Sequence, residues 1–328
     1  MGDRTDSCHI RAGELLSINR RQFLSAGAFG LVGAVMAGCV RIGASVESAY
    51  AISSTSSSTS ELLNARAPIV DDFSSNVQKL FEASPSHKFG TLVEGDIVDR
   101  GFVVNDVLRV PKLGDIPFSM RVPEDYDGSS AYALYIHVPG WSGWYARGIG
   151  ANLESQFVFS AQDYISDVIL ITPQPVDYLS TTVDMVIALT EWALNEYNID
   201  SQRVYLSGYS FGGETVSLVM AKRPELYSRV LHMASLWDGS VGALVEQEVP
   251  VMMVIGDDDE YYRVSDIERT YLGLRRKYEN RGFAEDEIDE LVVLDVKTSD
   301  YFYVDANQHD VGADLFASDS EIMGWLLR

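Results

Sequence analysis

Cysteine is almost absent from this sequence. Only Cys8 and Cys39 occur among its 328 residues, and both fall within the first forty positions. The rest of the chain therefore cannot form a disulfide and must be stabilised by its core. Hydrophobic residues make up 46% of the chain, which at this length is enough for one large core or two modest ones and argues against wholesale disorder.

Positive charge is also scarce. The chain has 25 Lys and Arg residues against 48 Asp and Glu residues, a formal net charge of -23. Proteins bind nucleic acids first through Lys and Arg side chains that neutralise phosphates, and a surface this acidic would repel them. We therefore expect no nucleic-acid partner and no polyanionic substrate.

Long apolar runs are missing, with one partial exception near the start of the chain. Residues 23–38 form an apolar stretch of about 16 residues, rich in Gly and Ala, which is short for a membrane span. Arg20 and Arg21 precede it, and the segment 36–39 (M-A-G-C) ends it. The arginine pair resembles the twin-arginine signal of exported proteins, and the M-A-G-C segment resembles the lipobox of bacterial lipoproteins.

This resemblance implies that residues 1–38 are a signal peptide and that cleavage leaves Cys39 as a lipidated first residue. The protein would then lie on the outer face of the cytoplasmic membrane, held by a lipid anchor, or be secreted. The alternative is an N-terminal amphipathic helix with an incidental arginine pair and Cys39 as a buried thiol.

Residues 39–90 are predicted to be a tether and linker. Ser and Thr fill the run 53–60, which cannot bury enough apolar area to fold. Residues 61 to about 88 show no strong periodic pattern. The folded domain is therefore expected over residues 91–328.

Apolar runs alternate with helical patterns through this domain. The runs near 101–104 and 118–123 suit an antiparallel leading edge. Six further runs of strand length occur at 132–138, 168–172, 204–207, 230–233, 249–255 and 291–296. Helical patterns lie at 181–197, after Gly213, at 265–278 and at 320–327. The alternation predicts an α/β fold of one domain, with a mainly parallel sheet flanked by helices on both faces.

The motif 208–212 (G-Y-S-F-G) lies between a predicted strand and a predicted helix. A bare G-x-S-x-G is a weak signal, but this context is that of a nucleophile elbow. The bend would strain Ser210, and a Cβ at either neighbouring glycine would collide across the turn. Ser210 is the candidate nucleophile; the alternative is a glycine-rich helix start with a capping serine.

A serine nucleophile usually needs a histidine base held by an acid. In folds that carry a nucleophile elbow, these residues follow one another along the chain in the order serine, acid, histidine. Of the five histidines, one falls in the predicted signal peptide and two precede Ser210. His232 lies within a predicted strand, where a core histidine is the ordinary explanation. His309 remains as the candidate base, in a polar loop expected between the last strand and the last helix; the alternative is a surface residue.

The acid is expected after the strand 249–255, where the sequence reads G-D-D-D-E over 256–260. Four adjacent carboxylates cannot all act, and most of them should be solvated. Asp259 is the first choice, with Asp257 next, Asp258 not excluded, and Asp238 after the preceding strand as a further candidate.

An oxyanion hole needs two backbone N–H groups. Phe211, which follows the nucleophile, would supply one, and Gly140 or Trp141 after the strand 132–138 would supply the other. Trp144 and Tyr145, beside this segment, could hold an aryl or sugar group of a substrate, although such aromatics also serve as core.

Together these features resemble bacterial esterases of the α/β-hydrolase superfamily, over about residues 95–328. They are similar to the catalytic domains of prolyl-oligopeptidase-like peptidases and to secreted polyester depolymerases and feruloyl esterases. The resemblance rests on the motif 208–214, the Gly-x-x-Asp run 256–259 and the segments 308–309 and 323–325. In that family the acid is the last residue of Gly-x-x-Asp, which implies Asp259. Two features depart from the resemblance: the β-propeller of full prolyl oligopeptidases is absent, and the extra carboxylates around Asp259 blur the assignment of the acid.

The resemblance implies a serine carboxylesterase that needs neither metal nor cofactor and acts on a small-molecule or oligomeric ester. A peptidase acting on short peptides is the second hypothesis. The third, from another class, is a lipid-anchored binding protein without activity. The oligomeric state and the acyl group of the substrate are not readable from the sequence.

Overall fold

The computed structural model describes residues 89–177 and 180–328. The predicted signal peptide, the lipidation site Cys39 and nearly all of the predicted tether fall on residues 1–88, outside the described part.

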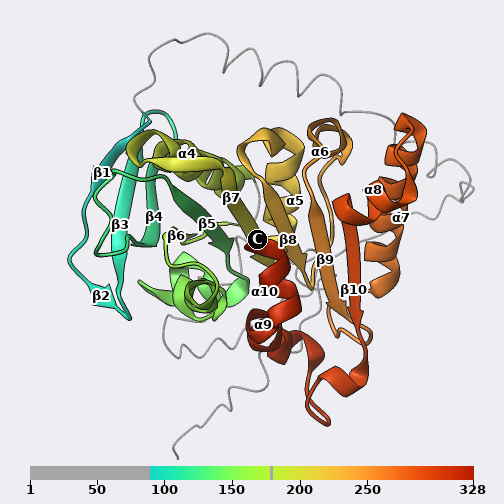
Figure 1. The fold of residues 1–328 in the computed structure, drawn as a ribbon. Helices are drawn as coiled ribbons and strands as arrows, with labels where there is room; N and C mark the ends of the chain where they lie inside the picture. Colours follow the sequence, from blue (N-terminus) through green and yellow to red (C-terminus); the bar gives the residue numbers. More distant parts are fainter. Residues whose placement is uncertain (1–88, 178–179) are drawn as a thin grey trace, which may run out of the picture. The chain divides into compact units, whose positions relative to one another are not determined.

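The described residues form one mixed, 10-stranded sheet (Figure 1). Its strands follow the order β1-β3-β4-β6-β5-β7-β8-β9-β10, and β2 pairs with β3. The strands from β6 to β10 in this order run parallel, while β1 to β4 pair antiparallel at the leading edge. The predicted fold class, with its antiparallel edge, is confirmed. The strands are β1 Thr91–Val93, β2 Val98–Asp99, β3 Phe102–Val110, β4 Gly114–Arg121, β5 Tyr132–Val138, β6 Val168–Pro173, β7 Ile199–Tyr209, β8 Arg229–Met233, β9 Val251–Gly256 and β10 Val292–Lys297.

Burial differs between the centre and the edge of the sheet. Every residue of β5, β6 and β9 is buried, because helices cover both faces of the parallel part. Along β3 buried residues alternate with partly buried ones, as in a strand with one face on the core. The sequence shows the same contrast between continuous apolar runs and looser alternation.

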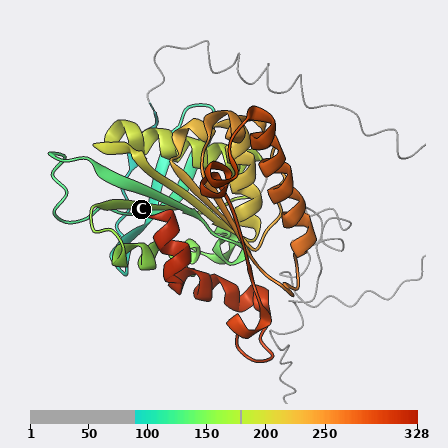
Figure 2. The same cartoon turned by 45° about the vertical axis from the view of Figure 1, so that its right-hand side comes forward.

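Helices lie on both faces of the sheet (Figure 2). One layer holds α4 to α8, which share a core with β5, β7 and β9. The other holds α3, α9 and α10 with a separate core. The helices are α3 Phe157–Ser160, α4 Ser180–Glu196, α5 Phe211–Lys222, α6 Gly242–Gln247, α7 Val264–Arg281, α8 Glu285–Leu291, α9 Gln308–Ser318 and α10 Ser320–Leu326. Short 3-10 turns are η2 Trp141–Gly143, η3 Tyr145–Arg147, η4 Ala151–Leu153, η5 Ala161–Asp163, η6 Pro224–Leu226 and η7 Ser299–Tyr301.

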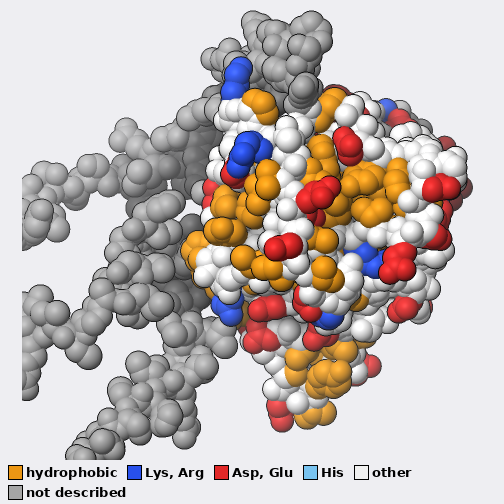
Figure 3. All heavy atoms as spheres, turned by 90° about the vertical axis from the view of Figure 1, so that its left-hand side faces the viewer, with side chains coloured by type: hydrophobic (Ala, Val, Ile, Leu, Met, Phe, Trp, Pro, Cys, Tyr) orange, Lys and Arg blue, Asp and Glu red, His pale blue; other side chains and the backbone are white. Residues whose placement is uncertain are grey.

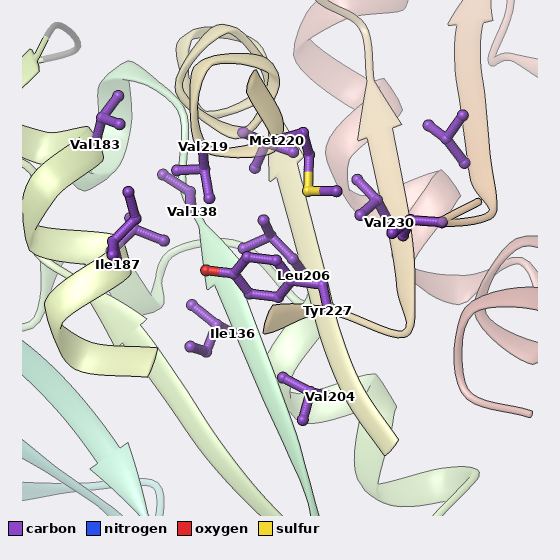
Figure 4. Packing of buried hydrophobic residues seen from close by; sticks show 14 of the residues in the cluster. Ile136, Val138, Val183, Ile187, Val204, Leu206, Val219, Met220, Tyr227 and Val230 are labelled. Atoms are coloured by element: carbon purple, nitrogen blue, oxygen red, sulfur yellow. The ribbon is translucent and has the colours of Figure 1, made fainter. Parts of the chain in front are cut away.

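The first core fixes the central strands beneath the site. Val183 and Ile187 of α4 and Val219 of α5 lie over Ile136 of β5 and Leu206 of β7 (Figure 4). Each fully buried aliphatic side chain contributes about 1.5–3 kcal/mol relative to exposure. These contacts therefore stabilise β5 and β7 beneath the site.

His309 was expected in a loop, and this expectation is wrong. It is the second residue of α9, a helix that the sequence analysis did not predict. The Asn307 side chain caps the helix by accepting the N–H of Asp310 at 2.8 Å. Phe316 of α9 is fully packed in the second core. Similarly, α5 begins at Phe211, directly after Ser210, rather than at Gly213.

Within residues 89–177 and 180–328, no helix has both the length and the apolar character needed to cross a membrane. Figure 3 shows the face at the antiparallel edge, where Lys and Arg side chains lie singly among acidic and apolar ones.

Candidate active site

The candidate residues gather where parallel strands end. Ser210 follows β7, Gly140 follows β5 and Asp259 follows β9, while His309 comes after β10. Because parallel strands end at the same edge of a sheet, residues far apart in the chain meet there. This edge is the usual ligand-binding side of an open α/β sheet.

Ser210 lies in a strained bend between β7 and α5. Its backbone dihedrals are φ 55° and ψ -125°, in a region that residues other than glycine rarely adopt. A Cβ on Gly208 would lie 2.3 Å from the Gly212 carbonyl oxygen, and one on Gly212 would lie 2.0 Å from the Val138 carbonyl oxygen. Close backbone packing therefore requires glycine at positions 208 and 212. The unusual backbone conformation of Ser210 costs of order 1–3 kcal/mol.

Ser210, His309 and Asp259 form a continuous chain of hydrogen bonds. His309 Nε2 is 3.0 Å from Ser210 Oγ, and His309 Nδ1 is 2.8 Å from Asp259 Oδ2. An ionised carboxylate can only accept a hydrogen bond, so Nδ1 carries the proton and Nε2 is left to accept from Oγ. The structure brings the three predicted residues together in the arrangement that a nucleophile, a base and an orienting acid require.

Asp259 is held on both oxygens. Its side chain is 1% exposed, and its Oδ1 accepts the N–H groups of Tyr261 at 3.0 Å and Tyr262 at 2.8 Å. These bonds fix Oδ2 toward the imidazole. The carboxylate therefore orients the His309 ring while its own position is set by the backbone of its loop.

The rival carboxylates lie elsewhere. Asp257 accepts hydrogen bonds from Ser299 and from Gln308 Nε2, and the Gln308 bond is the main reason that its pKa is lowered. Asp258 is exposed. Asp238 follows β8, where its backbone N–H donates to Ser217 Oγ at 3.0 Å.

As expected, most carboxylates of 256–260 are solvated, since Asp257, Asp258 and Glu260 are exposed. Three of the four, Asp257, Asp259 and Glu260, accept hydrogen bonds from the segment 299–309. The sequence pattern showed only the density of like charge, whereas the donors come from a segment about fifty residues away.

Gly140 lies close to the nucleophile. A Cβ on it would be 3.2 Å from Ser210 Cβ and 3.3 Å from the Tyr209 carbonyl oxygen. The next residue, Trp141, opens η2, and its ring lies 6.2 Å from that of Phe211. The three residues predicted for the oxyanion hole, Gly140, Trp141 and Phe211, are thus neighbours of Ser210.

Two further aromatic residues, Trp144 and Tyr145, follow Trp141 in the sequence. The Trp144 ring lies 4.6 Å from that of Trp141, and its Nε1–H donates to the Val176 carbonyl at 2.9 Å. Tyr145, at the start of η3, is 50% exposed. The predicted substrate-binding residues therefore lie on the same segment as Gly140 and Trp141.

Sequence reasoning missed several residues around His309. Tyr261 is partly exposed, with its ring 4.7 Å from the imidazole. Tyr209, one residue before the nucleophile, donates its hydroxyl to the His309 carbonyl. Burial is the main reason that the pKa of Tyr209 is raised. Only the position of Tyr209 inside the G-x-S-x-G motif could have drawn attention to it.

Two other histidines lie inside the sheet and are neutral. Burial lowers the pKa of His137 to about 3 and that of His232 to about 4. His137 Nδ1 is 2.8 Å from Ser207 Oγ, and His232 Nε2 is 3.0 Å from the Leu236 carbonyl. Both are core residues, as expected for His232. In the described part of the chain, no group of three His, Cys, Asp or Glu residues is placed to hold a metal ion.

Comparison with known proteins gives similarities in sequence and in fold. Residues 177–239, which include the nucleophile bend, match the prolyl oligopeptidase family. A thermostable esterase of known structure is 19% identical, with a TM-score of 0.54, over 67% of this chain and 61% of its own. The chain thus spans less than two thirds of that esterase. No curated protein matches the sequence.

Two further structures are more distant. Est1E from Butyrivibrio proteoclasticus is 14% identical over 65% of this chain and 93% of its own, with a TM-score of 0.43. Oligopeptidase B from Leishmania major is 14% identical over 70% and 37%, with a TM-score of 0.46.

The chain has the α/β-hydrolase fold. The family match over the nucleophile bend, in that fold, supports the class of serine hydrolases.

Proposed function

We propose that the protein is a serine carboxylesterase, with Ser210 as nucleophile, His309 as general base and acid, and Asp259 as the orienting acid. The observation that carries the proposal is the unbroken chain from Asp259 Oδ2 through the imidazole to Ser210 Oγ, with distances of 2.8 and 3.0 Å. Both Ser210 and His309 are 8% exposed, so the chain is shielded yet open to a reacting group.

Ser210 Oγ attacks the ester carbonyl carbon while its proton passes to His309 Nε2. The negative charge on the carbonyl oxygen is stabilised by the N–H groups of Phe211 and of Gly140 or Trp141. The intermediate collapses, the ester C–O bond breaks, and the leaving alcohol takes the proton from Nε2. Water then attacks the acyl-enzyme by the same route and releases the acid.

A peptidase is the second candidate function, favoured by the match of residues 177–239 to the prolyl oligopeptidase family. An ester is the simpler substrate because the described residues contain no propeller to select peptides by size. Turnover by the purified full chain should be compared on p-nitrophenyl esters and aminoacyl arylamides. Faster ester turnover is expected; faster amide turnover would favour the peptidase.

Partly exposed aromatic rings beside the nucleophile favour a substrate with an aryl or sugar group. The Trp144 ring packs on Trp141, whose ring lies 6.2 Å from that of Phe211, and Tyr261 packs on His309. Such rings bind planar groups by stacking and hydrophobic contact.

We also propose that the protein is exported and anchored by lipid on Cys39, as residues 20–39 predict. A Cys39→Ala variant should leave the membrane fraction and should not incorporate labelled fatty acid. Unchanged membrane association of this variant would contradict the anchor.

A further inference from the structure

Glu260 binds the start of the helix that carries His309. Its Oε1 accepts the N–H of Gln308 and its Oε2 accepts the N–H of His309, both at 3.0 Å. The first N–H groups of a helix have no partner within the helix and need acceptors from elsewhere. Here the acceptor follows Asp259 directly, so one loop contacts both the backbone and the imidazole of His309.

Gln308 makes a second set of contacts to the same loop. Its Nε2 donates to Asp257 Oδ1 at 2.9 Å, and its Oε1 accepts the N–H of Asp258 at 2.9 Å. The fit is close, because a Cβ on Gly256 would lie 2.2 Å from Gln308 Oε1. Gln308 is only 6% exposed.

The contacts of Glu260 and Gln308 surround the bond between Asp259 and His309. Four hydrogen bonds, made by three side chains and three backbone N–H groups, join loop 257–260 to the first turn of α9. A shift of about 1 Å in a catalytic group can cost about a hundredfold in rate. The 3.0 Å separation of Nε2 and Oγ therefore depends on how firmly this turn is held.

We propose that Glu260 and Gln308 are positioning residues, which lock the helix start bearing His309 to the loop bearing Asp259. Neither side chain bonds to the imidazole; both act through the backbone on which it stands. The proposal rests on the proposed function, since it concerns the base of that reaction.

A helix cap that serves stability alone would make the same contacts. Kinetic measurements distinguish a cap that only stabilises the fold from residues that position His309. Loss of positioning lowers kcat and the rate of covalent modification with little change in KM, whereas loss of stability lowers the fraction of folded protein and leaves the kinetics of the folded part unchanged.

The test compares Glu260→Gln with Asp258→Asn in the full chain. Both exchange an exposed carboxylate for an amide and remove one negative charge from the same loop. Only Glu260→Gln places an amide NH2 against a backbone N–H. Active-site concentration is set by titration with a fluorophosphonate, and Tm is measured for each variant.

For Glu260→Gln we expect kcat and the fluorophosphonate labelling rate to fall about tenfold, with KM within about twofold of wild type. Hydrogen exchange should quicken at the N–H groups of Gln308 and His309. Glu260→Asp, which keeps the carboxylate, should recover part of the loss. Asp258→Asn should stay within about twofold of wild type throughout.

Wild-type kinetics in Glu260→Gln would overturn the proposal, and an equal loss in Asp258→Asn would show that charge, not positioning, is responsible. If Glu260→Gln does not fold, Gln308→Glu is used instead. This variant keeps the acceptor for the Asp258 N–H but replaces the donor to Asp257 by a carboxylate oxygen. Wild-type kinetics in Gln308→Glu would also overturn the proposal. A wild-type chain that fails to react with the probe would instead refute the proposed function, and the positioning role with it.

Discussion

The nucleophile bend and the histidine turn meet in one site but are held by different means. Ser210 depends on glycines close to it in the sequence, because Gly208, Gly212 and Gly213 let other parts of the chain approach within distances that a Cβ would block. His309 is fixed by side chains of the loop 257–260, about fifty residues earlier in the chain. The glycines that the first arrangement requires are neighbours of Ser210 in the sequence, although Val138, which approaches Gly212, is not. The second arrangement needs specific side chains from two segments about fifty residues apart.

The largest loss of activity is expected on substitution of Asp259, because its carboxylate orients the imidazole that bonds to Ser210. Asp259→Asn removes the acceptor that fixes the imidazole tautomer and should lower kcat/KM on an ester by about 10³- to 10⁴-fold. Steady-state kinetics on a p-nitrophenyl ester measures this. Asp238→Asn is the control and should stay within a few-fold of wild type; the reverse order of losses would move the acid to Asp238.

The backbone of the bend can be tested by Gly212→Ala. The new Cβ would lie 2.0 Å from the Val138 carbonyl oxygen, so the bend must distort. We expect the free energy of unfolding to fall by about 3 kcal/mol and kcat/KM by about a hundredfold.

Gly273→Ala in α7 is the matched control, because nothing lies within 4 Å of its Cβ. It should stabilise the protein by about 0.5–1 kcal/mol through helix propensity. Chemical denaturation of both variants gives the comparison. A Gly212→Ala protein with unchanged stability and activity would show that the bend is not held by backbone packing.

The two buried histidines of the sheet should make the stability of the protein depend on pH in acid. The folded pKa values of His137, about 3, and His232, about 4, lie below the value of about 6.5 in an unfolded chain. The unfolded state therefore binds more protons than the folded state between these values. Stability should fall as pH falls from 6.5, by on the order of 3 kcal/mol for each histidine at pH 4.

Urea unfolding between pH 7 and pH 4.5 measures this slope. His137→Asn and His232→Asn should each flatten it, even if both variants are less stable at pH 7. A slope unchanged in both variants would mean that these imidazoles are not the groups taking up protons.

The smallest effect is expected at the aromatic residues outside the hydrogen-bonded chain. Trp144→Ala should raise KM for an aryl ester about two- to tenfold and leave KM for a short aliphatic ester nearly unchanged. A kinetic panel of both ester types checks this. Equal changes in the two series would assign Trp144 to support of η2 rather than to substrate.

The contrast between the two regions also explains what the sequence could predict. Continuous apolar runs mark the buried strands, and β5 was predicted with the bounds that it has. The nucleophile motif carries its own geometry, because its glycines and serine are neighbours. The helix α9 was missed because its stability depends on the cap Asn307 and on Phe316 in a core built from distant segments. Glu260 and Gln308 could not be assigned roles, because their partners lie in another segment.

The central claim is that Ser210 Oγ is an activated nucleophile. The most direct measurement is fluorophosphonate labelling of the purified full chain, with the modified peptide identified by mass spectrometry. We predict labelling at Ser210 in the wild-type protein and none in Ser210→Ala of equal Tm. Failure of the folded wild-type protein to label, or equal labelling of Ser210→Ala, would contradict the claim.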